Sequence, residues 1–155
     1  MDDAEAHEDA ALQVNGHAVA GLAAVCADHG STLVQVSTDY VFDGASSQPH
    51  GEEDPPAPRT AYGRSKLAGE QAALDLLADG ALGYVVRTAW LYGAHGPNFV
   101  RTMMDLECRR PVIDVVDDQR GWPSWTVDVA GQIIALVRFG AASGVYHATS
   151  SGETT

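Results

Sequence analysis

The stretch LVQVSTDYVFDG (residues 33–44) passes from branched apolar residues directly into small polar ones. Its first half has the character of a strand in a parallel sheet, where both faces are buried and Val, Ile and Leu dominate. In open α/β sheets, ligands bind in the crevice outside the carboxyl ends of such strands. Thr38 and Asp39 stand at that end. The stretch therefore predicts a strand over residues 32–37 that delivers polar side chains to a site.

The only lysine of the chain, Lys66, follows Tyr62 by four residues in the segment TAYGRSKLAGE (residues 60–70). Residues i and i+4 share one face of a helix, so the phenol and the ammonium can meet the same ligand. A nearby cation lowers the pKa of a tyrosine from its ordinary value of about 10, which favours a role as general acid. The spacing alone is also that of two unrelated residues on a solvated helix face. The catalytic interpretation of the pair is favoured because Thr38 precedes it at the end of a predicted strand.

Strand-like and helix-like segments alternate along the rest of the chain, which is typical of a doubly wound α/β sheet with right-handed crossovers. In the first helix, Val14, Leu22 and Val25 are expected to face the sheet. Residues 43–59 are rich in Gly, Ser, Pro and acids and predict a long mobile loop beside the site. The patterns predict helices over 2–28, 60–79, 99–109 and 127–139, and strands over 83–88, 112–116 and 145–148.

Four blocks in order, VSTDYVFDG, YGRSKLAGE, VVRTAWLYG and VVDDQRGWPSWTVDVA, resemble the dTDP-4-dehydrorhamnose reductase family of extended short-chain dehydrogenases/reductases. The resemblance runs from about Asp2 to Thr149. It implies that NADPH reduces the 4-keto group of a dTDP-linked 6-deoxy sugar, the last step in making dTDP-L-rhamnose. It leaves NADH open as the cofactor. It also implies a cytoplasmic enzyme with a dTDP-sugar as partner, and it is compatible with a homodimer of the full-length form.

The same resemblance implies roles for individual residues. Tyr62 is the proton donor, and Lys66 binds the nicotinamide ribose while it acidifies Tyr62. Both side chains are therefore catalytic and cofactor-binding. Thr38 holds the keto oxygen, while Asp39 and Trp90 touch the sugar. Without the family context, Trp90 would be interpreted as an aromatic residue at the edge of the core. No metal ligand is implied.

A feature normal for dinucleotide-binding halves is missing from these residues: no strand leads into a glycine-rich turn and a helix N-terminus that receives the pyrophosphate. Gly16 and Gly21 lie inside a predicted helix with no strand before them. The expected fold is therefore a partial Rossmann-like sheet without its N-terminal strands. Residues 1–110 would form the C-terminal part of the dinucleotide-binding domain, and 111–155 part of a small substrate-binding region.

Two other functions stay open. An epimerase or dehydratase of the same superfamily uses the same Tyr and Lys and often carries an acid directly after the Ser/Thr position, as Asp39 does here. A non-catalytic regulatory or truncated module would account for the missing glycine turn. Asn15 also has two interpretations. It either organises a proton-relay water, as an asparagine near this position does in the extended branch, or makes a local hydrogen bond.

Composition narrows the class of partner. The net charge of −12, from 21 acidic and 9 basic residues, argues against nucleic acid and anionic membranes, which bind basic patches. No run of about 18 consecutive apolar residues and no signal-peptide pattern occurs in the sequence. Cys26 and Cys108 are isolated thiols, expected to be reduced packing residues. These features fit a cytoplasmic globular protein.

Overall fold

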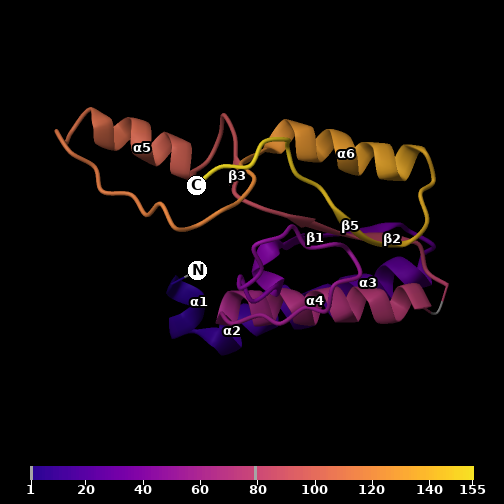
Figure 1. The fold of residues 1–155 in the computed structure, drawn as a ribbon. Helices are drawn as coiled ribbons and strands as arrows, with labels where there is room; N and C mark the ends of the chain where they lie inside the picture. Colours follow the sequence, from indigo (N-terminus) through magenta and orange to yellow (C-terminus); the bar gives the residue numbers. More distant parts are fainter. Residues whose placement is uncertain (1, 79) are drawn as a thin grey trace. The chain divides into compact units, whose positions relative to one another are not determined.

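The computed structural model describes residues 2–78 and 80–155, which fall into two units (Figure 1). The first unit comprises Met1–Arg87 and Gly140–His147, and the second comprises Thr88–Phe139 and Ala148–Thr155. The functional boundary predicted at residue 110 stays a prediction.

A three-stranded sheet forms the centre of the first unit, with β1 (Leu33–Thr38), β2 (Gly83–Thr88) and β5 (Gly144–His147) in the order β1-β2-β5. Strands β2 and β5 are parallel, with Tyr84 opposite Gly144. All six residues of β2 are buried, as expected for a branched apolar strand between two neighbours. The predicted α/β class with a parallel sheet is confirmed.

Helices cover one face of this sheet in the first unit, where α3 and α4 lie along the strands (Figure 1). Helix α4 also contacts α2 and the π-helical turn that precedes α3. The long N-terminal helix predicted over 2–28 is therefore present, but it is divided. Its segments are α1 (Asp2–Ala6), α2 (Glu8–Leu12), the π-helix Gln13–His17 and α3 (Ala18–Asp28). The helix that they contact is α4 (Ala61–Ala78).

The face that α3 buries differs from the predicted one. Val14, Leu22 and Val25 are 69%, 59% and 55% exposed, whereas Val19 and Ala23 are buried. The reason is that this stretch approaches α4 through its smaller residues, so its larger apolar side chains stay outside. By length and composition alone, Glu8–Asp28 is also apolar enough to cross a membrane, a test that core helices of soluble proteins pass as well.

The second unit contains a short parallel pair, β3 (Leu91–Tyr92) and β4 (Ser124–Trp125), and two helices, α5 (Phe99–Glu107) and α6 (Thr126–Arg138). The strand predicted over 112–116 is wrong. Those residues adopt no regular structure, and three of their valines are more than half exposed. No described segment lies beside them as a ladder partner, and a strand requires one for its backbone groups.

Candidate active site

The site begins at the carboxyl end of β1, where the chain turns through a 3-10 turn, Asp39–Val41. The hydroxyl of Thr38 donates to the Asp39 carboxylate at 3.0 Å and accepts from the backbone N–H of Tyr40 at 3.2 Å. Thr38 is 7% exposed. A side chain that both donates and accepts while buried has little freedom, so its hydroxyl is held at one place at the strand end.

Tyr62 lies in the first turn of α4, and two kinds of contact hold that turn. Thr60 caps the helix, because its hydroxyl accepts from the backbone N–H of Gly63 at 3.0 Å. A Cβ atom at Gly63 would collide with the carbonyl oxygen of Tyr40, so only glycine allows this approach. The rings of Tyr40 and Tyr62 meet edge to face, with centroids 6.0 Å apart.

The N-terminal helices also fasten the start of α4. A Glu5 carboxylate oxygen accepts from the backbone N–H of Ala61 at 2.7 Å. Arg64 donates to both carboxylate oxygens of Glu8, at 2.6 and 2.9 Å. These partners are 56 residues apart, so no local sequence pattern could have indicated them. A carboxylate at a helix N-terminus is also favoured by the helix dipole.

The Thr38 hydroxyl lies close enough to the Tyr62 phenol to affect its pKa. Burial raises the pKa of Tyr62, the Thr38 hydroxyl lowers it, and the charge of Asp39 raises it further. Lys66 is not among the groups that shift this pKa. The net direction is opposite to the lowering expected from Lys66, because burial outweighs the other influences. Tyr62 is thus held in its protonated form, with a proton available to donate.

Lys66 lies one turn further along α4. Its ammonium donates to the carbonyl oxygen of Val36 in β1 at 2.7 Å. Burial lowers the pKa of Lys66, and the charge of Glu70 acts in the opposite direction. The structure therefore brings Thr38, Asp39 and Tyr62 together and fastens Lys66 to the same strand.

Asn15 braces the same turn from the π-helix. Its side-chain amide donates to the hydroxyl of Ser65 at 3.1 Å, and that hydroxyl donates to the carbonyl oxygen of Tyr62 at 2.8 Å. Ser65 is 1% exposed. The hydrogen bond of Asn15 thus reaches across to α4 instead of staying within its own helix. Its role in a proton relay stays a prediction. π-helical turns recur at functional sites, and this one supplies an anchoring side chain.

Two neighbouring polar groups, the Asp39 carboxyl and the Ser37 hydroxyl, are also buried. Burial raises the pKa of the Asp39 carboxyl more than the hydrogen bond from Thr38 lowers it. The hydroxyl of Ser37 is buried and has no hydrogen-bond partner among the described residues. A buried hydroxyl without a partner is costly, so this group is available to a ligand at the end of β1.

The loop over residues 43–59 is fastened at its middle, although the sequence predicted a mobile segment. Glu52 accepts from the backbone N–H of His147 at 3.2 Å through its carboxylate, and from Arg87 at 3.4 Å through its carbonyl oxygen. The ring of His50 stacks on Phe42, with centroids 4.0 Å apart. These contacts tie the loop to the carboxyl ends of β2 and β5.

A buried ion pair lies beneath this loop. The guanidinium of Arg87 in β2 donates to both carboxylate oxygens of Glu70 in α4, at 2.8 to 3.2 Å. The two side chains are 5% and 0% exposed. The Arg87 guanidinium also lies 5.1 Å from the centre of the Phe42 ring. Neither member of this pair was singled out from the sequence.

Trp90 belongs to the second unit. It has a φ of +43°, and it is the only described residue other than glycine with a positive φ. Its carbonyl oxygen accepts from the backbone N–H of Ser124 at 3.1 Å. A left-handed backbone is a genuine outlier for a bulky side chain and persists only where the surroundings enforce it. This conformation marks Trp90 independently of its family resemblance.

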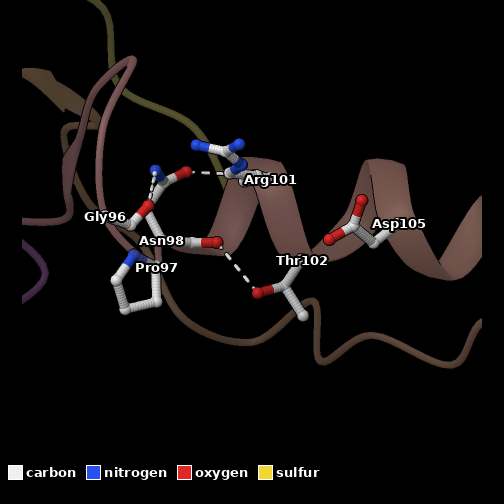
Figure 2. Close-up of a pocket in the computed structure, with 6 residues that line it drawn as sticks. All are labelled: Gly96, Pro97, Asn98, Arg101, Thr102 and Asp105. Atoms are coloured by element: carbon white, nitrogen blue, oxygen red, sulfur yellow. Dashed lines mark hydrogen bonds between the residues drawn. The ribbon is translucent and has the colours of Figure 1, made fainter.

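The second unit also carries a shallow hollow of about 280 Å³ at the beginning of α5 (Figure 2). The Asn98 side chain caps that helix by accepting from the backbone N–H of Arg101 at 3.0 Å. Thr102 donates to the carbonyl oxygen of Asn98 at 2.9 Å. The sequence alone did not indicate this hollow. Its lining residues are Gly96, Pro97, Asn98, Arg101, Thr102 and Asp105.

The polar groups at the end of β1 suit one end of a dinucleotide. The Ser37 hydroxyl, the Tyr62 phenol and the Lys66 ammonium match the hydrogen-bonding groups of a nicotinamide and its ribose. The 155 residues hold no glycine-rich turn after a strand for a pyrophosphate. In the part of the chain that the structure describes, no group of three or more His, Cys, Asp or Glu residues is placed to hold a metal ion.

Comparison with known proteins places this geometry in context. A family model described as "RmlD substrate binding domain" matches residues 1–155. The chain is 61% identical over 153 residues to a dTDP-4-keto-6-deoxy-D-glucose reductase of Streptomyces niveus, covering 99% of this chain and 52% of that protein. It is 48% identical to a dTDP-4-dehydrorhamnose reductase of Streptomyces griseus, covering 100% and 52%. The chain thus spans about half the length of these relatives.

A solved structure shows the same relationship. The crystal structure of dTDP-4-dehydrorhamnose reductase from Bacillus anthracis in complex with NADP superimposes with a TM-score of 0.94 at 38% identity. The match covers 100% of this chain and 54% of the other. The predicted Rossmann-like fold, as a partial sheet, is therefore confirmed.

Proposed function

Because the chain belongs to the RmlD substrate binding domain family, we propose that it forms part of a cytoplasmic enzyme that reduces the 4-keto group of a dTDP-4-dehydro-6-deoxy sugar. The observation that carries the proposal is the gathering of three groups at the carboxyl end of β1: Thr38 ends the strand, Tyr62 lies beside it, and Lys66 is fastened to the same strand. We assign dTDP-4-dehydrorhamnose as substrate and dTDP-L-rhamnose as product. The 61% identical relative is a dTDP-4-keto-6-deoxy-D-glucose reductase, so dTDP-4-keto-6-deoxyglucose is the substrate to compare.

The chemistry follows from what each side chain can do. In this structure the Thr38 hydroxyl donates to Asp39; when the sugar binds, it turns to donate to the keto oxygen instead and places that oxygen beside the phenol of Tyr62. Tyr62, whose phenol is protonated at neutral pH, donates its proton to the oxygen as negative charge develops there. The Lys66 ammonium stabilises that charge and holds the ribose of the cofactor. NADPH, when bound, supplies the hydride that reaches C4 of the sugar.

Trp90 and Asp39 complete the assignment on the substrate side. We propose that the indole of Trp90 is a flat apolar platform for the sugar ring. The Asp39 carboxylate accepts a hydrogen bond from Thr38 at 3.0 Å and so orients the Thr38 hydroxyl. Asp39 would also accept from a sugar hydroxyl, which makes it a second contact to the substrate.

Replacement of the proton donor tests this proposal. In the whole protein, Tyr62→Phe removes one oxygen and should lower the turnover number by about 10²- to 10⁴-fold, the usual contribution of a general acid. The affinity for NADPH should fall by about tenfold at most, the contribution of one hydrogen bond, because the phenyl ring keeps its packing against Tyr40. The assay follows NADPH absorbance with dTDP-4-dehydrorhamnose and with dTDP-4-keto-6-deoxyglucose.

Tyr146→Phe is the matched control, because its hydroxyl donates to the carbonyl oxygen of Ala142 and has no role in the proposal. This control should retain turnover. If Tyr62→Phe retained most of the wild-type rate, Tyr62 would not be the proton donor.

The raised pKa of Asp39 favours a second candidate, an epimerase or dehydratase that uses Asp39 as a second acid. The two reactions differ in their use of cofactor. A reductase consumes one NADPH for each product formed, whereas an epimerase or dehydratase returns the cofactor to its starting state. Product analysis with the oxidised and reduced cofactor therefore separates them.

A further inference from the structure

The left-handed backbone of Trp90 is accompanied by an unusually close approach of its indole ring to a second segment. A Cβ atom built on Gly121 would lie 2.6 Å from Cε2, 2.8 Å from Cζ2 and 3.0 Å from Nε1 of Trp90. Real Cβ atoms essentially never show contacts under 3.0 Å. The backbone of Gly121 thus forms a surface on which the indole lies, and any side chain at this position would occupy the space of the ring.

The segment that carries Gly121 is itself held in place. Gly121 and Thr154 exchange two backbone hydrogen bonds, each 3.0 Å long. An Arg120–Glu153 ion pair at 2.6 Å reinforces the same contact. On the other side of Gly121, the backbone N–H of Ser124 donates to the carbonyl oxygen of Trp90. The ring, the backbone of Trp90 and the segment 120–124 therefore form one connected unit.

We propose that Gly121 is a positioning residue that sets the orientation of the Trp90 indole, and with it the fit of the sugar. This proposal rests on the proposed function, in which Trp90 forms a platform for the sugar ring. A rotation about the side-chain bonds of Trp90 would remove that platform, while the side chains of Tyr62 and Lys66 would stay as they are. Gly121 should therefore affect how tightly the sugar nucleotide binds more than how fast it is reduced.

A double-mutant cycle tests the proposal in the whole protein, with Gly121→Ala, Trp90→Ala and the two together. Gly121→Ala should raise KM for the dTDP-4-dehydro-6-deoxy sugar by about tenfold, with a much smaller change in kcat. In the Trp90→Ala background the same change should alter KM less than about twofold, because the indole that it displaces is gone. Gly131→Ala is the control, since a Cβ there meets open space.

Unfolding midpoints of the wild-type protein, the two single variants of the cycle and the double variant give a readout that does not depend on activity. Gly121→Ala should lower the midpoint in the wild-type background and leave it nearly unchanged in the Trp90→Ala background. If Gly121→Ala fails to fold, addition of Trp90→Ala should restore folding. Equal penalties in both backgrounds, an unrescued double variant, or no effect of Gly121→Ala on either readout would each overturn the positioning role.

The same measurements can contradict the proposed contact between Trp90 and the sugar without contradicting the positioning role of Gly121. If Trp90→Ala left KM unchanged while the midpoints remained coupled, Trp90 would not touch the sugar, yet Gly121 would still hold its ring. The measurements therefore distinguish the two failures.

Discussion

Lys66 is the only lysine of the chain and lies at the one place where its spacing to Tyr62 has chemical meaning. The sequence predicted this pair because it is local: four residues on one helix face. Thr38 was predictable for a similar reason, since it ends a recognisable strand. The pKa of Tyr62 was not predictable, because burial depends on residues from several elements. Spacing indicates which groups can meet, and the packing around them sets their proton affinities.

Titration of Lys66 gives a direct test at this scale. With 13C-labelled lysine, its ε-carbon gives a single signal from these 155 residues. We expect its midpoint to lie below that of the same residue in the chain unfolded in urea, because burial lowers the pKa of Lys66. Glu70→Gln should lower the midpoint further, since the charge of Glu70 raises this pKa. Asp75→Asn, an exposed change on the same helix, is the control.

The lowered pKa of Lys66 also determines whether the free energy of unfolding rises or falls with pH. Between the folded pKa of Lys66 and its ordinary value of about 10.5, the unfolded chain binds more protons than the folded one. The contribution of Lys66 to the free energy of unfolding should therefore rise with pH through that window. A midpoint at or above the value in urea would contradict both expectations.

At the level of helices and strands, the contacts that position the site link distant parts of the chain. Glu5 and Glu8 fasten the first turn of α4 from 56 residues away. Arg87 of β2 is paired with Glu70 of α4. Hydrophobic periodicity locates the elements, but it carries no information on which charged residue pairs with which.

The same limit explains why the predicted strand over 112–116 is absent and why α3 buries a different face from the predicted one. The apolar pattern of 112–116 resembles a strand, yet no described segment lies beside it as a partner. Helix α3 was oriented by its largest apolar residues, whereas it packs through small ones such as Ala23. Both segments are apolar, as their sequences indicate. Whether such a segment forms a strand, and which face of a helix it buries, depends on the element that packs against it in the fold.

The buried pair offers a test at this scale. Arg87→Met removes a guanidinium that is 5% exposed and leaves the Glu70 carboxylate buried without its partner. We expect a loss of about 3–5 kcal/mol in the free energy of unfolding, the usual cost of an uncompensated buried charge. The double variant Glu70→Leu/Arg87→Met should recover most of that loss. Urea unfolding monitored by circular dichroism measures both.

Arg64→Met is the matched control for that prediction. It breaks the Glu8–Arg64 pair, whose side chains are 47% and 45% exposed, so solvent replaces the lost contact and the effect should be much smaller. A loss for Arg87→Met no larger than that for Arg64→Met would mean that water reaches the Glu70 carboxylate.

At the scale of the whole molecule, the chain spans about half the length of its curated relatives. The groups that we propose for reduction are Thr38, Tyr62 and Lys66, which all lie in the first unit. Trp90, the proposed platform for the sugar, lies in the second. The phosphate-binding turn usual for a dinucleotide site is not among these residues. The chain therefore contains the reacting end of the proposed cofactor site without the part that normally supplies most of the affinity for its pyrophosphate.

That division predicts the behaviour of the 155-residue chain by itself. We expect its Kd for NADPH to be weaker than about 100 μM, because the hydroxyl and ammonium groups of Ser37, Tyr62 and Lys66 contact one end of the dinucleotide at most. Isothermal titration calorimetry measures this directly, with the reductase of Bacillus anthracis, whose structure contains NADP, as the positive control. A micromolar Kd would mean that these residues supply a phosphate site of another kind. The Arg101 hollow at the start of α5 would then be the first place to test by substitution, because it combines a guanidinium with a helix N-terminus.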